Sequence, residues 1–141
     1  MIIKGTHEQQ FEIRILGYQY PDATEYFDAI WLNVYFEYKS TDESWHYTDP
    51  SFMIGDVEAI VNWFNKLADN CKPEYNSMRF LDTNLYIKRF TQFDSPINKF
   101  RIVQGKFSMD FEYDNQGLKL LASELADELS KFPWRGIDAF E

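Results

Sequence analysis

The sequence predicts one α+β domain, spanning residues 1–141, in which a largely antiparallel sheet of about six to eight strands packs against two amphipathic helices. Three observations predict this fold class. The length of 141 residues suits a single domain. Several segments alternate apolar and polar residues with the two-residue period of half-buried strands, whereas two segments repeat every three to four residues, as amphipathic helices do. The order of these segments is βββ-α-ββββ-α.

Three strands are predicted before the first helix. Phe11–Ile15 alternates apolar and charged residues. Ile30–Tyr38 alternates most regularly and has aromatic residues at both sets of positions, which predicts partial cover on each face of the sheet. A hairpin turn at Thr41–Glu43 is predicted to return the chain into a third strand, Ser44–Thr48, and Pro50 is predicted to mark its end.

The first helix is predicted between Asp56 and Pro73. Its apolar residues recur at i, i+3, i+4, i+7, i+10 and i+11, which places them on one helical face. They are Val57, Ile60, Val61, Phe64, Leu67 and Ala68. Acidic Asp56 and Glu58 in the first turn and Lys66 near the end complement the helix dipole.

Four more strands and a second helix complete the chain. The strands are predicted at Met78–Leu81, Leu85–Thr91, Phe100–Gln104 and Lys106–Tyr113. The helix is predicted from about Asn115 to Lys131, with Asp114 or Asn115 as its N-cap. Its apolar stripe consists of Leu118, Leu121, Ala122, Leu125 and Leu129. Residues 1–9 and 135–141 lie outside the predicted elements, and we expect them to be loosely held.

Composition excludes several classes of protein. Hydrophobic residues make up 45% of the chain and aromatic residues 18%, which is ample for a packed core and excludes disorder as the main state. No apolar stretch approaches the ~20 residues that cross a bilayer, and the first residues lack the apolar region of a signal peptide. The single cysteine, Cys71, excludes a disulfide framework and a cysteine-based zinc site. We therefore expect a cytoplasmic protein with no cofactor, no metal and no membrane partner.

The charge is acidic and unevenly distributed. The chain has 14 Lys and Arg against 23 Asp and Glu, a net charge of −9, which would repel nucleic acid and attract a basic partner. Residues 1–70 contain four cations and 12 acids, and residues 71–141 contain ten cations and 11 acids. Most of the excess falls between Pro21 and Glu58, which predicts a one-sided field if the fold keeps these acids together. The alternative is that the charge only keeps the protein soluble.

Catalytic motifs are scarce. None of the six glycines forms a phosphate-binding loop or a nucleophile elbow. His46 and Asp49 form the one candidate general-base pair, but a hydrolase would also need a nucleophile or metal that the sequence does not show. The segment 79–106 interleaves basic and aromatic residues in the manner of RNA-binding proteins, and the net charge argues against that interpretation. A small-ligand or regulatory binding domain, with an aromatic-lined pocket between sheet and helices, is a second alternative.

Several motifs resemble the WapI-type immunity proteins, which are found beside bacterial polymorphic and cell-wall-associated toxins. The matching segments are FEIRILGYQYP from Phe11, FDAIWLNV from Phe27, WHYTDPSFM from Trp45, IVNWFNKLA from Ile60, Phe80–Leu85 and the terminal Phe132-Pro133. The resemblance covers residues 11–90 and the last helix. It implies a cytoplasmic protein that binds and neutralises the toxin domain of its own system. Because catalytic motifs are scarce, we predict that it does so without catalysis.

The resemblance also suggests what kind of partner to expect. Many such toxin domains are nucleases, and nucleases that grip RNA or DNA are basic, so an acidic inhibitor can compete for the phosphate-binding surface. We therefore predict a monomeric inhibitor of a basic toxin domain. The predicted contact residues are Asp22, Glu25, Asp42, Glu43, Asp49 and Asp56, with Trp45 and Tyr47 as aromatic anchors.

Overall fold

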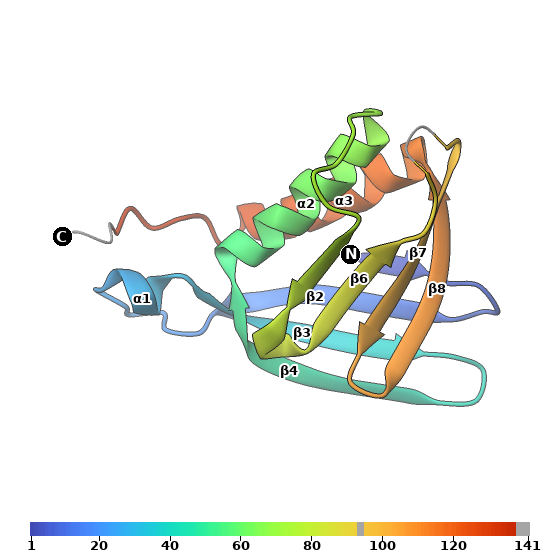
Figure 1. The fold of residues 1–141 in the computed structure, drawn as a ribbon. Helices are drawn as coiled ribbons and strands as arrows, with labels where there is room; N and C mark the ends of the chain where they lie inside the picture. Colours follow the sequence, from blue (N-terminus) through green and yellow to red (C-terminus); the bar gives the residue numbers. More distant parts are fainter. Residues whose placement is uncertain (93–94, 138–141) are drawn as a thin grey trace.

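The computed structural model describes residues 1–92 and 95–137, which form two four-stranded antiparallel sheets and three α-helices (Figure 1). The first sheet contains, in spatial order, β1 (Ile2–Lys4), β2 (Gln10–Tyr18), β3 (Trp31–Lys39) and β4 (Ser44–Met53). The second contains β5 (Ser77–Phe80), β6 (Leu85–Arg89), β7 (Ile97–Gln104) and β8 (Phe107–Asp114). The helices are α1 (Tyr26–Ala29), α2 (Ile54–Ala68) and α3 (Asn115–Ser130), and a short 3₁₀ turn covers Leu81–Thr83. The α+β class and the order of the predicted elements are confirmed, with strands divided between two sheets.

One hydrophobic core joins the sheets and the two long helices. The sheets cross each other, and α2 and α3 lie side by side over one open side of the crossing (Figure 1). Phe11 of the first sheet stacks on Phe107 of the second at a centroid distance of 5.2 Å. Trp63 of α2 meets Phe100 of the second sheet edge-on at 5.6 Å. Because every layer contributes buried side chains to the same cluster, no layer folds around a core of its own.

The N-terminal segment is ordered by its contacts with both sheets. Residues 1–9 were expected to be loosely held, but Ile3 is fully buried in β1. The amino group of Met1 donates to the carbonyl oxygen of Ile13 at 2.9 Å and also pairs with Glu128 of α3. Farther along, the Thr6 amide donates to the Asp110 carbonyl oxygen of β8 at 3.0 Å, which ties the two sheets together. The sequence pattern missed β1 because three residues are too few to show a period.

The strand β4 continues past the proline that was predicted to end it. Leu32 pairs with Phe52 and Val34 pairs with Asp49, so β4 has one extra residue in a bulge that contains Pro50. Since β4 is an edge strand, the missing proline N–H does not break a ladder on its outer side. The bulge returns the chain to the sheet and leads directly into α2.

Candidate binding surface

One end of the molecule is built from two segments that lie far apart in the sequence. The connection between β2 and β3, which includes α1, lies beside the segment that follows α3 (Figure 1, left). The Tyr18 hydroxyl donates to the Pro133 carbonyl oxygen at 2.6 Å, and the Tyr18 ring meets Phe132 edge-on at 5.7 Å. The C-terminal segment therefore braces the β2–β3 connection.

Arg135 is the central contact of this brace. Its guanidinium lies over the Tyr18 ring, 4.0 Å from the centroid. Nη1 donates to the carbonyl oxygens of Tyr20 and Pro21 at 3.0 and 2.9 Å, and Nη2 donates to that of Ala29 at 3.2 Å. Residues 135–141 were expected to be loosely held; Arg135 is firmly anchored, and residues 138–141 lie outside the described part of the chain.

Three large apolar rings are exposed at this end. The side chain of Phe27 is 71% exposed, that of Tyr20 45% and that of Trp134 41%. Tyr26 holds two of them in place, because its ring meets Phe27 at 5.2 Å and Trp134 at 5.6 Å. Exposed aromatic clusters of this kind are typical of protein-binding surfaces.

Exposed carboxylates lie in the same segment of the chain as Tyr20 and Phe27. Asp22 and Glu25 precede α1 and Asp28 lies within it, and all three are exposed. We call the surface formed by Tyr20, Asp22, Glu25, Phe27, Asp28 and Trp134 the aromatic–acidic end. Its composition, with exposed rings and carboxylates together, suits a partner that presents both cations and apolar side chains.

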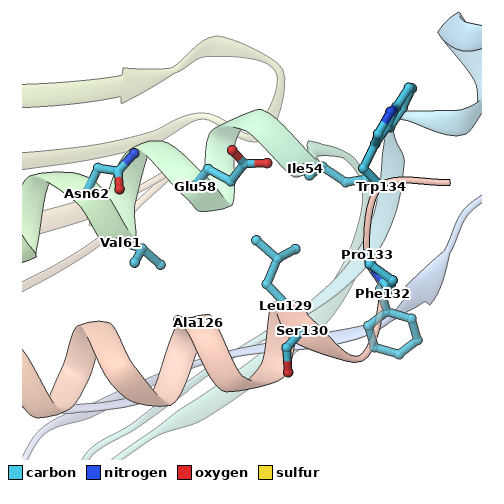
Figure 2. Close-up of a pocket in the computed structure, with 10 residues that line it drawn as sticks. All are labelled: Ile54, Glu58, Val61, Asn62, Ala126, Leu129, Ser130, Phe132, Pro133 and Trp134. Atoms are coloured by element: carbon cyan, nitrogen blue, oxygen red, sulfur yellow. The ribbon is translucent and has the colours of Figure 1, made fainter. Parts of the chain in front are cut away.

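A pocket of about 330 Å³ adjoins this end, between α2 and α3 (Figure 2). Val61 and Leu129 point into the gap between the helices, and Trp134 stands at its mouth. The hydroxyl of Ser130 donates to the Asp127 carbonyl oxygen of its own helix at 2.6 Å. The other lining residues combine apolar side chains, among them Ile54 and Phe132, with the polar side chains of Glu58 and Asn62.

The structure divides the predicted contact residues between two ends of the first sheet. Asp22 and Glu25 lie in the aromatic–acidic end, whereas Asp42 and Glu43 lie in the β3–β4 turn. The nine residues of β3 separate the two groups, a distance of about 30 Å at ~3.3 Å per residue. The acids between Pro21 and Glu58, which are close together in the sequence, thus do not form one continuous surface.

The predicted anchors Trp45 and Tyr47 face the interior. Both are half-buried and pack against the core. The Trp45 ring lies 5.6 Å from that of Phe107 and 6.5 Å from that of Phe11. Burial raises the pKa of the Tyr47 hydroxyl, and the nearby carboxylate of Asp49 raises it further. Most of the surface of these two rings is used by the fold.

Asp56 caps α2. Its Oδ2 accepts the backbone N–H of Met53 at 2.9 Å, a bond that satisfies a free donor at the helix N-terminus. Partial burial raises the pKa of the Asp56 carboxyl, an effect that the Met53 bond opposes. Asp56, which was predicted to contact the toxin, thus stabilises the start of α2.

His46 and Asp49 lie on opposite faces of β4. Asp49 is in register with the buried Val34, whereas His46 is in register with Glu37 and stacks on the Tyr35 ring at 5.7 Å on the outer face. The strand alternation that separates them removes the general-base pair considered from the sequence. Among residues 1–92 and 95–137, no group of three or more His, Cys, Asp or Glu side chains could hold a metal ion.

The lengths of the helices bear on whether the chain could cross a membrane. The longest of them, α2 and α3, have 15 and 16 residues. No helix in the described part of the chain is long and apolar enough to cross a bilayer.

Comparison with protein families identifies the chain. The model of the immunity protein WapI-like family matches residues 1–133, which include every strand and helix described above. The chain belongs to the WapI-like immunity protein family. Neither the curated proteins nor the solved structures contain a match. Membership confirms the resemblance seen in the motifs and indicates a toxin-neutralising function.

Some residues of the aromatic–acidic end could not be chosen from the sequence. Tyr20, Phe27, Asp28 and Trp134 were not among the predicted contacts, and neither was Arg135, which braces this end. One signal was available: Phe27 is a large apolar residue outside any apolar repeat, with acids on both sides. The role of Arg135 leaves no such signal, because its carbonyl partners lie more than 100 positions away.

Proposed function

We propose that this protein binds a basic nuclease toxin domain one-to-one through the aromatic–acidic end and neutralises it without catalysis. The protein acts as a monomer in the cytoplasm of the cell that makes the toxin. The observation that carries the proposal is the 71% exposure of Phe27 beside the carboxylates of Asp22, Glu25 and Asp28. Exposing an apolar ring to water is unfavourable in free energy, so this exposure suggests that a partner covers the ring.

The two components of this surface have different tasks. The carboxylates accelerate encounter with a cationic surface, an effect that salt screens. Phe27 and Trp134 supply apolar area that leaves water on binding and slows dissociation. The pocket beside Trp134 can accept a side chain of the partner with an apolar stem.

The connection that presents Phe27 is held rigid before any partner arrives. Arg135 fixes three of its carbonyl oxygens, and Tyr26 packs between Phe27 and Trp134. A surface ordered in advance loses less conformational entropy on binding, so more of the contact energy appears as affinity.

A charge-reversal pair tests the proposal. Asp22→Lys combined with Glu25→Lys changes the aromatic–acidic end, and Asp42→Lys combined with Glu43→Lys makes the same change in net charge at the β3–β4 turn. Affinity for the toxin domain encoded beside the protein is measured at low and high salt, together with residual nuclease activity. We expect the first variant to bind at least tenfold more weakly and to leave the nuclease active, and the second to behave like the wild type.

The outcomes separate the parts of the proposal. If the second variant fails and the first binds normally, recognition occurs at the turn and the proposed surface is wrong. If both bind normally with undiminished salt dependence, neither acidic group makes the contact. A toxin domain that is folded, active and unaffected by the wild-type protein would refute neutralisation itself.

A further inference from the structure

The outer face of the second sheet is basic although the protein is acidic. Exposed or half-exposed cations and rings occupy its outward positions on β5, β6 and β7 and on the residue after β6. They are Arg79, Tyr86, Lys88, Phe90, Lys99 and Arg101, and we call them the basic face. Neither the aromatic–acidic end nor the proposed toxin contact includes any of them.

The strand register places these side chains in a regular array. Arg79 is opposite Tyr86, and Lys88 is opposite Arg101. The amide of Phe90 donates to the Lys99 carbonyl oxygen at 2.8 Å, which continues the array beyond β6. Tyr86, Lys88 and Phe90 are alternate residues and point to the same side, so ring, cation and ring follow one another along one line.

The rings are held by the cations and still reach solvent. The side chain of Phe90 is 52% exposed. Lys88 Nζ lies 5.2 Å from its centroid and the Arg101 guanidinium 5.4 Å away. Arg79 lies 4.8 Å from the centroid of Tyr86. These contacts keep the rings in place on an open sheet and put positive charge next to each of them.

The fold divides the basic and aromatic residues of segment 79–106 into a buried group and an outward-facing group. Arg89 is buried, and it donates from Nε to Asn98 Oδ1 at 3.2 Å and from Nη2 to the Gln92 carbonyl oxygen at 2.7 Å. Phe100 is also buried and stacks on Phe111 at 4.9 Å. Only the outward members remain available to a partner, and these are the cations and rings of the basic face.

Local charge, rather than net charge, decides what this face attracts. Asp110 forms a two-point ion pair with Arg101, and Glu112 is in register with Lys99, so acids line the β8 side. On the β5 side, Lys88 is opposite Ser77, which carries no charge. The Debye length is about 8 Å at physiological salt, so the charges on and next to this face, rather than the net charge, decide what it attracts.

We infer that the basic face binds single-stranded nucleic acid, with bases stacking on Phe90 and Tyr86 and phosphates pairing with Lys88, Lys99 and Arg79. An open antiparallel sheet with rings and cations in alternation is the type of surface that binds unpaired bases without strong sequence preference. A hollow of about 440 Å³ lies on the same face, lined by Phe90, Lys99 and Arg101 together with the acidic Asp110 and Glu112, and it can receive a base. If the partner were an acidic protein, the cations of this face would suffice to attract it, and two rings at this spacing would have no function.

The test uses the full chain with fluorescein-labelled oligouridine and oligothymidine, followed by fluorescence anisotropy over a range of salt concentrations. We expect saturable binding that weakens as salt rises. Phe90→Ala should weaken binding about fivefold or more, the loss of one stacked base. Lys88→Gln should reduce the slope of log affinity against log salt by about 0.7, the loss of one phosphate contact.

Matched controls come from other surfaces of the chain. Phe27→Ala removes an exposed ring from the aromatic–acidic end, and Lys119→Gln removes a cation that pairs with Asp69 at 2.8 Å on a different surface. Both should leave oligonucleotide binding unchanged. Thermal unfolding of every variant separates loss of binding from loss of folding.

Three outcomes would overturn the inference. The first is a folded wild-type protein that binds neither oligonucleotide at low salt. The second is competition by polyglutamate as effective as that by oligouridine, which would assign the face to an acidic protein. The third is equal affinity for duplex and single strands with no effect of Phe90→Ala, which would leave only non-specific attraction. Preference for oligouridine or for oligothymidine distinguishes RNA from DNA.

Discussion

At the scale of single residues, side chains distant in sequence are joined by a few polar contacts. Arg135 is the clearest case, since one guanidinium serves three carbonyl oxygens of the β2–β3 connection and covers the ring of Tyr18. A guanidinium can do this because it carries five N–H donors in a plane. A lysine has three donors on one nitrogen and could not span carbonyl groups that lie before α1 and at its last residue.

Removing Arg135 should therefore loosen the aromatic–acidic end. We expect Arg135→Ala to lower the free energy of unfolding by about 1–3 kcal/mol, because three carbonyl oxygens lose a charged donor. Arg135→Lys should recover less than half of that loss. Urea unfolding measures both, and equal stability of all three proteins would show that the brace contributes nothing.

A second residue-scale prediction concerns the outer face of the first sheet. The Tyr35 hydroxyl donates to Glu37 Oε2 at 2.6 Å, and Lys39 lies 3.0 Å from the same carboxylate. The hydrogen bond from Tyr35 lowers the pKa of Glu37, and Lys39 lowers it further. A lowered folded-state pKa contributes stability above the unfolded-state value, and this contribution is lost as pH falls through the folded-state value.

Tyr35→Phe removes the larger of the two causes. We expect the Glu37 pKa to rise toward its ordinary value in the variant, and the loss of stability on acidification to become smaller. Carbon-detected NMR titration of the Glu37 carboxyl group measures the pKa directly. An unchanged pKa would mean that Lys39 alone holds the carboxylate in its charged form.

At the scale of elements, a close approach between two segments can require a residue without a side chain, and helix or strand propensity does not reveal this requirement. Gly5 follows β1 where the chain crosses to β8, and a Cβ at this position would lie 2.6 Å from the Met109 side chain and 3.0 Å from the Asp110 carbonyl oxygen. Gly55 lies in the first turn of α2, and a Cβ there would meet nothing within 4 Å. The two glycines thus have opposite tolerance for a methyl group.

We expect Gly5→Ala to destabilise the protein by about 1–3 kcal/mol, because the methyl group overpacks the junction of the two sheets. Gly55→Ala should stabilise it by up to about 1 kcal/mol, because alanine is the better helix former and restricts the unfolded chain. Chemical denaturation of the two variants gives both values. A neutral Gly5→Ala would show that the β1–β8 contact can move apart without cost.

At the scale of the whole molecule, the two sheets depend on one core. Phe11 and Phe107 stack between them, and the Thr6 amide bonds to Asp110. We expect one cooperative unfolding transition, because neither sheet can keep its inner face buried without the other. Tryptophan fluorescence and far-ultraviolet circular dichroism should give the same midpoint, and separate midpoints would show that the sheets unfold independently.

The sequence by itself determined the class, the order of the longer elements and the family. The period of Val57, Ile60 and Phe64 identified α2, and alternation identified β3 and β8, because burial on one face imposes a period that needs no knowledge of the partner layer. The short elements β1 and α1 left no periodic signal. The general prediction of an acidic protein with a basic partner likewise needed only the sum of its charges.

Only the tertiary structure decided where the charges and rings lie. It separated Asp22 from Asp42 by the length of β3, turned Trp45 inward, and used Asp56 as a helix cap. It also moved Arg89 into the interior and left Phe90 outside. The physical reason is that a surface is assembled from segments whose distance in sequence carries no information about their distance in space, as Arg135 and Tyr20 demonstrate.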